Sequence, residues 1–273
     1  MPSTPTTTPL NLSWWDGQNF GDALNPLVVS HISGRDVELA NRNKADLFCV
    51  GSILHKVQPI FHKKQKKRPV IWGTGMRSPI AELRFTKHVE FNAVRGPITA
   101  SLLGIRDVAF GDPGLFLADL TDPNITRTDK VGLIPHHADF NERKAANSVD
   151  LFQNNTDITL IDPRTKDSVS VANQIKSCRH VYSASLHGLI VADALGVPNT
   201  WVVSKTNKIH QTAEIKFLDY FLSVRRPYVP PITFHDLSAY DLTRTCADRL
   251  DYANGVEDSK NALRETFPQE LFA

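Results

Sequence analysis

Short apolar segments of strand length recur along the chain, and longer segments with helical spacing separate them. In the first half these segments are residues 10–15, 45–52, 68–75, 88–96 and 107–114. In the second half they are residues 130–139, 157–163, 179–185 and 197–204. Strands that alternate with helices in this way are typical of parallel sheets, so the sequence predicts an α/β protein.

Start and stop signals refine the expected helices. Asn25 followed by Pro26 is typical of a helix start, so residues 19–22 are expected to form the loop before that helix. Residues 168–178 and 186–196 carry helical patterns between strands, and Gly196 stands at a C-cap position.

Polar residues 121–130 interrupt the pattern and suggest a domain boundary. We therefore expect an N-terminal Rossmann-like domain over residues 1–122 and a C-terminal Rossmann-like domain over residues 123–226. Residues 227–273 are expected to form a helical tail that packs back on both. The predicted architecture is two Rossmann-like domains that face each other across a cleft.

Composition adds limits on partners and compartment. Thirty-one Lys and Arg residues nearly balance 29 Asp and Glu residues, so nothing in the overall charge indicates a nucleic-acid partner. Cys49, Cys178 and Cys246 are odd in number and widely spaced, which favours buried thiols over disulfides or zinc ligands. The first ten residues have no signal-peptide pattern, so we expect a frayed N-terminus and a cytoplasmic enzyme.

The clearest candidate site follows the strand at 179–185. In parallel sheets ligands bind beyond the carboxyl ends of the strands, and this strand leads directly into a helix start. The hydroxyl, imidazole and backbone N–H groups there would suit an anion. The residues are Ser183, Ser185, Leu186, His187 and Gly188. Alternatively, the serines serve only as helix caps and the histidine has a structural role.

Three further strand ends carry polar side chains. Arg95 could offer a guanidinium fork to a carboxylate or phosphate, or could pair with an acidic surface neighbour. Asp112 could act as a carboxylate in the cleft, or could belong to a tight structural turn. His136 and His137 lack further ligands for a metal nearby, so one of them is expected to transfer protons, donate hydrogen bonds or lie in the core.

A basic run precedes the strand at 68–75. It consists of Lys63, Lys64, Lys66, Lys67 and Arg68. Such a run is usually a solvated face, but it could also contact an anionic membrane surface or the diphosphate of a lipid-linked acceptor.

Three tryptophans stand near predicted strand ends, namely Trp14, Trp15 and Trp72. Each could provide a stacking face for a sugar ring. Large aromatic residues belong more often to the core, so both interpretations stay open.

Eight motifs occur in an order and spacing that resemble the polysaccharide pyruvyl transferase family. They are N-F-G-D at 19–22, W-G-T-G at 72–75, V-R-G-P at 94–97, G-D-P-G-L at 111–115, I-P-H-H-A-D at 134–139, S-A-S-L-H-G-L-I at 183–190, A-L-G-V-P at 194–198 and K-F-L-D-Y-F-L-S-V at 216–224. Each motif alone is weak, but the ordered set over residues 10–225 is specific. The resemblance is greatest to members that form ketals on exopolysaccharide repeat units.

The resemblance implies a glycosyltransferase-B-like pair of domains that binds phosphoenolpyruvate in the cleft. It implies transfer of pyruvate to two hydroxyls of a sugar as a cyclic ketal, with release of phosphate. The acceptor would be a saccharide carried on a lipid-linked oligosaccharide, at the inner face of the membrane. Neither a metal nor a redox cofactor is expected.

The resemblance also implies roles for particular residues. The family's basic pair corresponds to Arg95 and His187, with His187 as the acid that protonates the donor. Asp22 or Asp112 would be the base. Many members have arginine at the position of Ser185, so another group must supply that contact. Residues expected to bind substrates are Asn19, Gly21, Gly75, His136, His137, Ser183, Ser185, Leu186, Gly188 and Lys216.

Two alternatives compete with this reading. A glycosyltransferase that uses a nucleotide sugar would share the fold, and fold alone does not decide function. A non-catalytic carbohydrate-binding relative could retain the cleft without turnover. Intact Arg95 and His187 argue against that second alternative, whereas Ser185 favours it.

Overall fold

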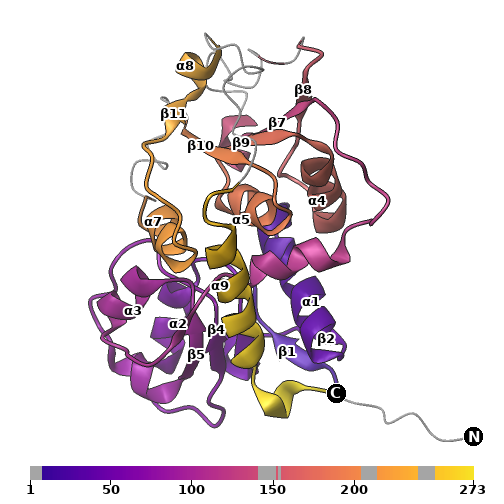
Figure 1. Cartoon of the computed structure of the whole chain (residues 1–273). Coiled ribbons are helices and arrows are strands. Elements are labelled where there is room, and N and C mark those ends of the chain that lie inside the picture. Colours follow the sequence, from indigo (N-terminus) through magenta and orange to yellow (C-terminus); the bar gives the residue numbers. More distant parts are fainter. Residues whose placement is uncertain (1–7, 141–151, 153–154, 204–213, 239–249) are drawn as a thin grey trace, which may run out of the picture.

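The fold is built on two parallel sheets, seen one above the other in Figure 1. A computed structural model describes residues 8–140, 152, 155–203, 214–238 and 250–273. The expected frayed N-terminus up to residue 7, part of the tail and Cys246 lie outside the described residues. The predicted boundary at residue 122 falls between β6, which ends at Phe110, and β7, which begins at Val131.

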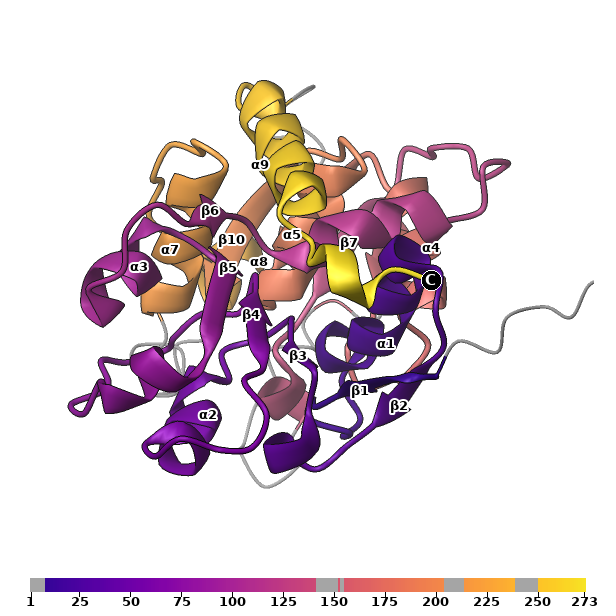
Figure 2. The same cartoon turned by 90° about the horizontal axis from the view of Figure 1, so that it is seen from below.

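The first sheet has six strands in the order β2-β1-β3-β4-β5-β6. In that order they are Val37–Leu39, Leu10–Leu12, Leu47–Phe48, Val70–Trp72, Glu90–Val94 and Ala109–Phe110. Every described pairing is parallel. Figure 2 shows β1 to β5 side by side from below.

The second sheet has five parallel strands in the order β8-β7-β9-β10-β11. They are Ile158–Leu160, Val131–Ile134, His180–Ser183, Asn199–Val203 and Ile232–Thr233. In each sheet the first strand in sequence lies between the second and the third, as in β2-β1-β3 and β8-β7-β9. This order places a ligand site between the carboxyl ends of the first and third strands. The prediction of an α/β protein with two parallel sheets is confirmed.

Helices cover both faces of the first sheet and lie between the sheets. The α-helices are α1 (Phe20–Ser33), α2 (Leu54–Phe61), α3 (Pro97–Leu103), α4 (Ser168–Ser177), α5 (Leu186–Ala194), α7 (Glu214–Ser223), α8 (Phe234–Ser238) and α9 (Ala253–Glu265). The 3₁₀ segments are η1 (Arg42–Lys44), η2 (Arg84–His88), η3 (Pro113–Leu120), η4 (His137–Phe140) and η6 (Gln269–Leu271).

One apolar core is continuous between the two sheets. Alternate residues of a strand face opposite sides, so Leu47 joins the core that reaches the second sheet while Phe48 packs under α2 and α3. Ile134 and Val181 enter the same central core from the second sheet. Cys49 and Cys178 are free, buried thiols, and burial raises the pKa of Cys178 to about 11.

Helix α1 begins earlier than the sequence predicts. Asn19 is its N-cap, so residues 19–22 form the cap and first turn rather than a loop, and Pro26 lies inside the helix. Proline cannot donate the hydrogen bond that the Asp22 carbonyl would normally accept. The side-chain Nδ2 of Asn25 donates to that carbonyl at 2.9 Å and takes the place of the missing backbone N–H.

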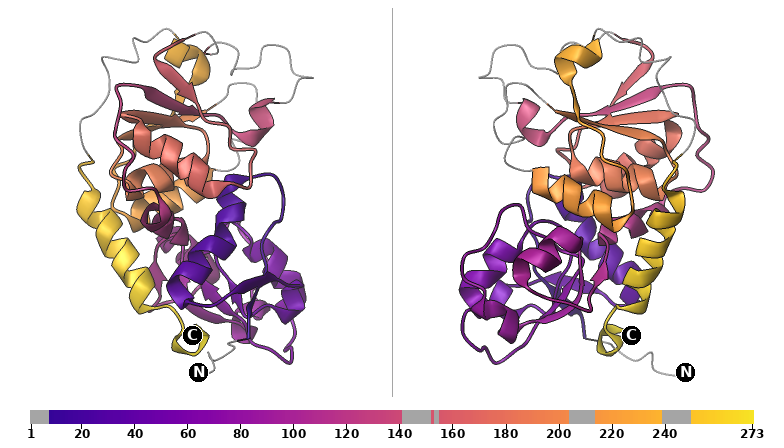
Figure 3. Two further views of the ribbon diagram at one scale, coloured as in Figure 1. Left: turned by 90° about the vertical axis from the view of Figure 1, so that its right-hand side faces the viewer. Right: turned by 60° about the vertical axis from the view of Figure 1, so that its left-hand side comes forward.

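The tail crosses the side of the molecule and contacts both the first sheet and helix α5 of the second half. Helix α9 contacts α5, β6 and η3. Figures 1 and 3 show it running along one side of the molecule, over the upper and the lower halves. Trp72 Nε1 of β4 donates to the Leu263 carbonyl of α9 at 3.0 Å. Of the helices that the structure describes, none combines the length and the apolar character needed to cross a membrane.

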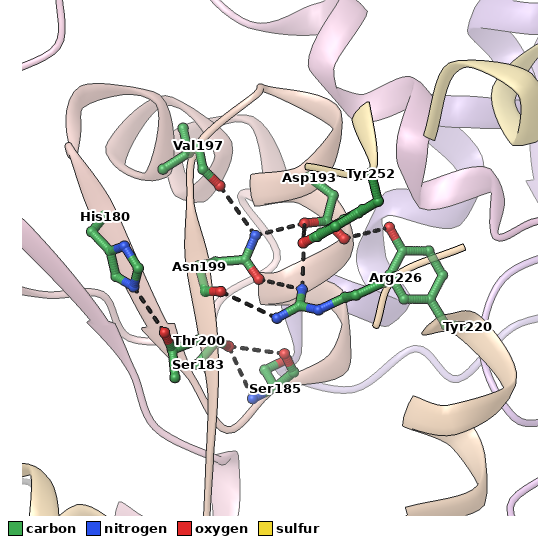
Figure 4. A network of polar contacts seen from close by, with 10 residues as sticks. All are labelled: His180, Ser183, Ser185, Asp193, Val197, Asn199, Thr200, Tyr220, Arg226 and Tyr252. Atoms are coloured by element: carbon green, nitrogen blue, oxygen red, sulfur yellow. Dashed lines mark hydrogen bonds and ion pairs between the residues drawn. The ribbon is translucent and has the colours of Figure 1, made fainter. Parts of the chain in front are cut away.

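A buried carboxylate joins the tail to the second sheet (Figure 4). Asp193 in α5 is almost fully buried and accepts hydrogen bonds from Tyr220 of α7 at 2.9 Å and Tyr252 beside α9 at 2.7 Å. Asn199 of β10 donates to the same carboxylate at 2.6 Å, and the Arg226 guanidinium lies 3.4 Å away. The network therefore links three segments that are distant in sequence, at residues 193–199, 220–226 and 252.

We predict that Tyr252→Phe lowers the free energy of unfolding by about 1–2 kcal/mol, because a buried acceptor loses one donor. Tyr228→Phe is the control, since Tyr228 is 57% exposed and has no hydrogen bond among the described residues. Urea denaturation measures both variants, and the control should stay within about 0.5 kcal/mol of the parent. Equal stability of Tyr252→Phe and the parent would show that the hydrogen bond from Tyr252 to Asp193 does not stabilise the fold.

Candidate functional site

A cavity of about 730 Å³ lies where the carboxyl ends of the two sheets face each other. Residues that follow β1, β3, β4 and β5 line one side, and residues that follow β7, β8 and β9, with α7, line the other. Nine predicted site residues line this cavity. They are Asn19, Asp22, Arg95, His136, His137, Ser185, Leu186, His187 and Lys216.

Arg95 reaches the cavity from the end of β5, but its side chain is fully buried. Its Nε lies 3.2 Å from the Asp219 carboxylate of α7. Its Nη1 donates to Ser52 Oγ at 2.8 Å and its Nη2 to the Met76 carbonyl at 2.5 Å. The sequence allowed either a guanidinium that binds a ligand or one paired with an acidic neighbour at the surface. The structure shows instead a guanidinium that is paired with an acidic residue in the interior. One N–H on each of its two Nη atoms has no hydrogen-bond partner among the described residues.

His187 enters the cavity from the first turn of α5 and is partly exposed there. Its ring lies against the backbone of Gly21, where an added Cβ would come within 2.0 Å of Nδ1. Phe20 contacts the ring edge to face, with 6.5 Å between the ring centroids. Nε2 is buried and has no hydrogen-bond partner among the described residues. The imidazole position is therefore set by packing.

The surroundings of His187 disfavour its charged form. Burial, together with the nearby Lys216 ammonium and Arg95 guanidinium, lowers its pKa to about 3. With no ligand bound, the imidazole is therefore neutral at physiological pH. An anion in the cavity would oppose both cations and raise this pKa.

The serines before α5 have different positions. Ser183 is fully buried, accepts from the Ser185 N–H at 3.1 Å and donates to the Ser185 carbonyl at 2.8 Å (Figure 4). Ser185 is the N-cap of α5 and lines the cavity. The N–H groups of Leu186 and His187 have no hydrogen-bond partner in the part of the chain that the structure describes. They are the groups at this helix start that can still donate to an anion.

Lys216 and Asp22 approach the cavity from opposite sides and have shifted pKa values. Burial lowers the pKa of Lys216 to about 8, with Arg95 contributing, whereas Asp22 opposes the shift. Burial raises the pKa of Asp22 to about 6, although Lys56 and Lys216 oppose that shift. Each group therefore titrates near neutral pH, as proton-transfer groups must.

His136 and His137 both line the cavity after β7. Their ring centroids are 4.0 Å apart. His136 is nearly buried and its backbone N–H donates to Asp139 Oδ2 at 2.9 Å, whereas His137 is exposed. The tight turn after β7 brings both histidines to the cavity, although alternation along a strand would separate them.

Five predicted residues lie behind the cavity wall, where they shape it without lining it. Asp112 is fully buried, and its Oδ1 accepts from the Gly114 N–H at 3.0 Å to cap η3. Gly75 lies under the Arg95 guanidinium, with 2.5 Å between an added Cβ and Cζ. Gly188 packs in the same way on Ser183 Oγ at 2.3 Å. The set is Gly21, Gly75, Asp112, Ser183 and Gly188.

Several lining residues were missed. Lys56 and His55 lie on the first turn of α2, and Arg77 follows β4. Their positions after strands of the first sheet were a usable signal, but a single Lys or Arg carries little weight alone. Lys56 and Arg77 join Arg95 and Lys216 in a wall of four Lys and Arg side chains. Asp22 is the acidic residue among the described lining residues. The cavity therefore suits an anionic substrate.

The basic run lies away from this cavity. It connects the end of α2 to the start of β4, so it lies at the opposite edge of the first sheet. Lys67 forms an ion pair with Asp46, and Arg68 donates to the Val89 carbonyl at 3.2 and 3.1 Å. Contact of this run with a membrane or a lipid-linked diphosphate stays a prediction.

Comparisons with known proteins agree with the motifs. A family model described as polysaccharide pyruvyl transferase matches residues 9–206. An uncharacterized protein, L143, of Acanthamoeba polyphaga mimivirus is 32% identical over 218 residues, which cover 74% of this chain and 69% of that protein. The succinoglycan biosynthesis protein ExoV of Rhizobium meliloti (strain 1021) is 26% identical over 221 residues, covering 80% of this chain and 66% of ExoV. The chain spans about two thirds of the length of these relatives, and no solved structure matches it.

We predict that Asp22→Asn raises the melting temperature by a few degrees above pH 6 and that the gain disappears near pH 4. The raised pKa, from 3.8 to about 6, means that folding favours the protonated carboxyl. Its stabilising contribution is complete below pH 3.8 and is lost as the pH rises through about 6. Thermal unfolding of parent and variant between pH 4 and 8 measures the difference.

Asp36→Asn removes an exposed carboxylate outside the cavity and serves as the control for loss of one negative charge. If Asp22→Asn changes the melting temperature equally at pH 4 and pH 8, the Asp22 pKa is not raised.

Proposed function

Because this chain belongs to the polysaccharide pyruvyl transferase family, we propose that it transfers pyruvate from phosphoenolpyruvate to two hydroxyls of a saccharide and releases phosphate. The observation that carries this proposal is that Arg95 and His187, which belong to different sheets, line one cavity. Both residues stand in motifs of the family. The facing sheets also suit the glycosyltransferase-B-like arrangement that the resemblance implies.

The charges of the cavity suit this donor. Phosphoenolpyruvate has a carboxylate and a phosphate, and the wall offers Lys56, Arg77, Arg95 and Lys216. We assign the remaining Arg95 N–H groups, the Lys216 ammonium and the first N–H groups of α5 to these anions. Lys216 thereby supplies a cation in the neighbourhood of Ser185.

His187 is the proposed acid. The donor's negative charge raises the pKa of the imidazole, so His187 takes up a proton as phosphoenolpyruvate binds. Transfer of that proton to C3 converts the methylene to a methyl group and leaves a cationic centre at C2. Substrate binding and activation of the acid are thus one event.

The remaining steps balance without a cofactor. One sugar hydroxyl adds to C2 and its proton returns to His187, with Asp22 as the proposed base that accepts it on the way. The C2–O bond to phosphate breaks, and the second hydroxyl of the same sugar closes the ketal. The proton of this second hydroxyl is taken up by the departing phosphate. The preorganised cations stabilise the charge that develops on the departing phosphate.

The proposed acceptor is a saccharide of polysaccharide synthesis. We propose a lipid-linked oligosaccharide presented at the inner face of a membrane, with the enzyme in the cytoplasm or bound to that face. A nucleotide-sugar donor is the competing hypothesis.

We predict that phosphoenolpyruvate raises the melting temperature and that nucleotide sugars do not. A ligand that binds only the native state stabilises it by about 2.7 kcal/mol at 100 times its Kd. Differential scanning fluorimetry with phosphoenolpyruvate, UDP-glucose and GDP-mannose makes the comparison. Strong stabilisation by a nucleotide sugar, without an effect of phosphoenolpyruvate, would identify the protein as a glycosyltransferase.

We predict that binding of phosphoenolpyruvate to the parent at pH 7 takes up close to one proton that His187→Gln does not take up. Calorimetric titration in buffers of different ionisation enthalpy measures this proton. His187→Gln should also lower kcat by about 100-fold or more, as loss of a general acid does.

The matched control is His180→Gln. This histidine is also buried, with its pKa lowered to about 4, but it bonds Thr200 and lies outside the cavity. The control should retain the proton uptake of the parent. Equal proton uptake by His187→Gln and the parent would assign the acid to another group, with His136, His137 and Lys216 as the remaining candidates.

A further inference from the structure

The cavity has two chemically different ends. In the first sheet β1 and β5 are separated by three strand spacings, which is roughly 14 Å. The cations Arg95 and Lys216 are at the β5 end, where the ion pair of Arg95 and Asp219 joins the two sides. At the β1 end the wall includes Trp15, Asn19 and Pro163.

Trp15 differs from the other tryptophans of the chain. Trp72 and Trp201 are buried in the core, and Trp14 packs partly buried against it. Trp15 is 45% exposed and lines the cavity. A large indole that is half exposed at a cavity is not explained by core packing, because its apolar surface stays in contact with water.

The indole packs against the backbone of Gly17. An added Cβ on Gly17 would lie 2.3 Å from Cζ2 of Trp15, so the ring rests directly on the glycine backbone. Any other residue at position 17 would displace the ring. The sequence thus fixes a tryptophan with one face supported by its own loop.

The loop that carries Trp15 is tied across the cleft. Asp16 Oδ1 accepts from Lys166 Nζ at 2.5 Å, and the Phe20 N–H donates to the Pro163 carbonyl at 3.0 Å. Ser168 Oγ also donates to the Phe20 carbonyl at 2.7 Å. Both sides of the cavity therefore meet at the β1 end, and the ring is preorganised there.

A rigid, half-exposed aromatic face suits a sugar ring. The C–H face of a pyranose is apolar and loses contact with water when it stacks on an indole, while its hydroxyls remain at the edge for hydrogen bonds. Asn19 lines the same end, and its Oδ1 already accepts from the Gly21 N–H at 2.9 Å. Its amide nitrogen has no partner among the described residues and can donate to a hydroxyl.

We propose that Trp15 is the platform on which the acceptor pyranose stacks, with phosphoenolpyruvate at the cationic end of the same cavity. This inference rests on the proposed function for the identity of the donor, but the stacking itself does not. His187 adjoins both ends, because its ring packs against Gly21 and Phe20 after β1 and lies within electrostatic reach of Arg95 and Lys216. The acceptor hydroxyls would therefore face His187.

Trp15→Ala tests the platform with methyl β-D-glucopyranoside and methyl β-D-galactopyranoside as probes. Saturation-transfer NMR without donor reports stacking, and it should lose most of its signal from the ring C–H protons in Trp15→Ala. In turnover the KM for the glycoside should rise about 10-fold or more, and Trp15→Phe should restore most of the loss because it keeps an aromatic face. The calorimetric Kd for phosphoenolpyruvate should stay within about 2-fold of the parent value.

Tyr228→Ala is the matched control, because Tyr228 is 57% exposed and lies outside the cavity. It should leave both the glycoside signal and the KM unchanged. Glycoside signals in Trp15→Ala equal to those of the parent would overturn the platform and leave the proposed function intact. Equal loss of glycoside and phosphoenolpyruvate binding in Trp15→Ala would overturn the division into two ends. If the parent stacks glycosides on Trp15 but does not bind phosphoenolpyruvate, the platform holds and the proposed function fails.

Discussion

The architecture of the cleft depends on a buried ion pair between Arg95 and Asp219. Both side chains are fully buried, and removal of either would leave an uncompensated charge in the interior. Asp219 also accepts from the Thr99 N–H at 2.9 Å and from Thr99 Oγ1 at 2.6 Å, so it caps α3 as well. Because Asp219 lies one helical turn after Lys216, this one pair sets the position of α7 and of its lysine relative to the first sheet.

Glycines allow the parts of the site to approach each other. An added Cβ on Gly96 would lie 1.9 Å from the Asp219 carbonyl, and one on Gly21 would collide with His187. In both places a backbone from the first half meets a group from the second half. The two sides of the cleft are therefore in direct backbone contact. Ion pairs join them at its opposite ends, Arg95 with Asp219 at one and Lys166 with Asp16 at the other.

Under the proposed function, the same charges account for both the binding of an anionic donor and the protonation state of His187. Lys216 and Arg95 help to keep His187 neutral, and an anionic donor would oppose their effect. A histidine with a low pKa in such a place is consistent with catalysis, provided that protonation accompanies binding. This coupling would also limit side reactions, since the acid forms only when the donor is present.

The sequence alone determined the α/β class, the two parallel sheets and the family, because strand periodicity and ordered motifs are local signals. It also placed Arg95 and His187 directly after predicted strands, where parallel sheets bind ligands, and the resemblance paired them. The predicted start of α1 was wrong. The helix continues through Pro26 because the Asn25 side chain replaces the hydrogen bond that Pro26 cannot donate. Only the tertiary structure decided which groups line the cavity: Asp112 lies behind the wall, whereas Lys56, Arg77 and the half-exposed Trp15 belong to it. The physical reason is that burial and charge at a site come from packing between segments far apart in sequence, and no local pattern records that packing.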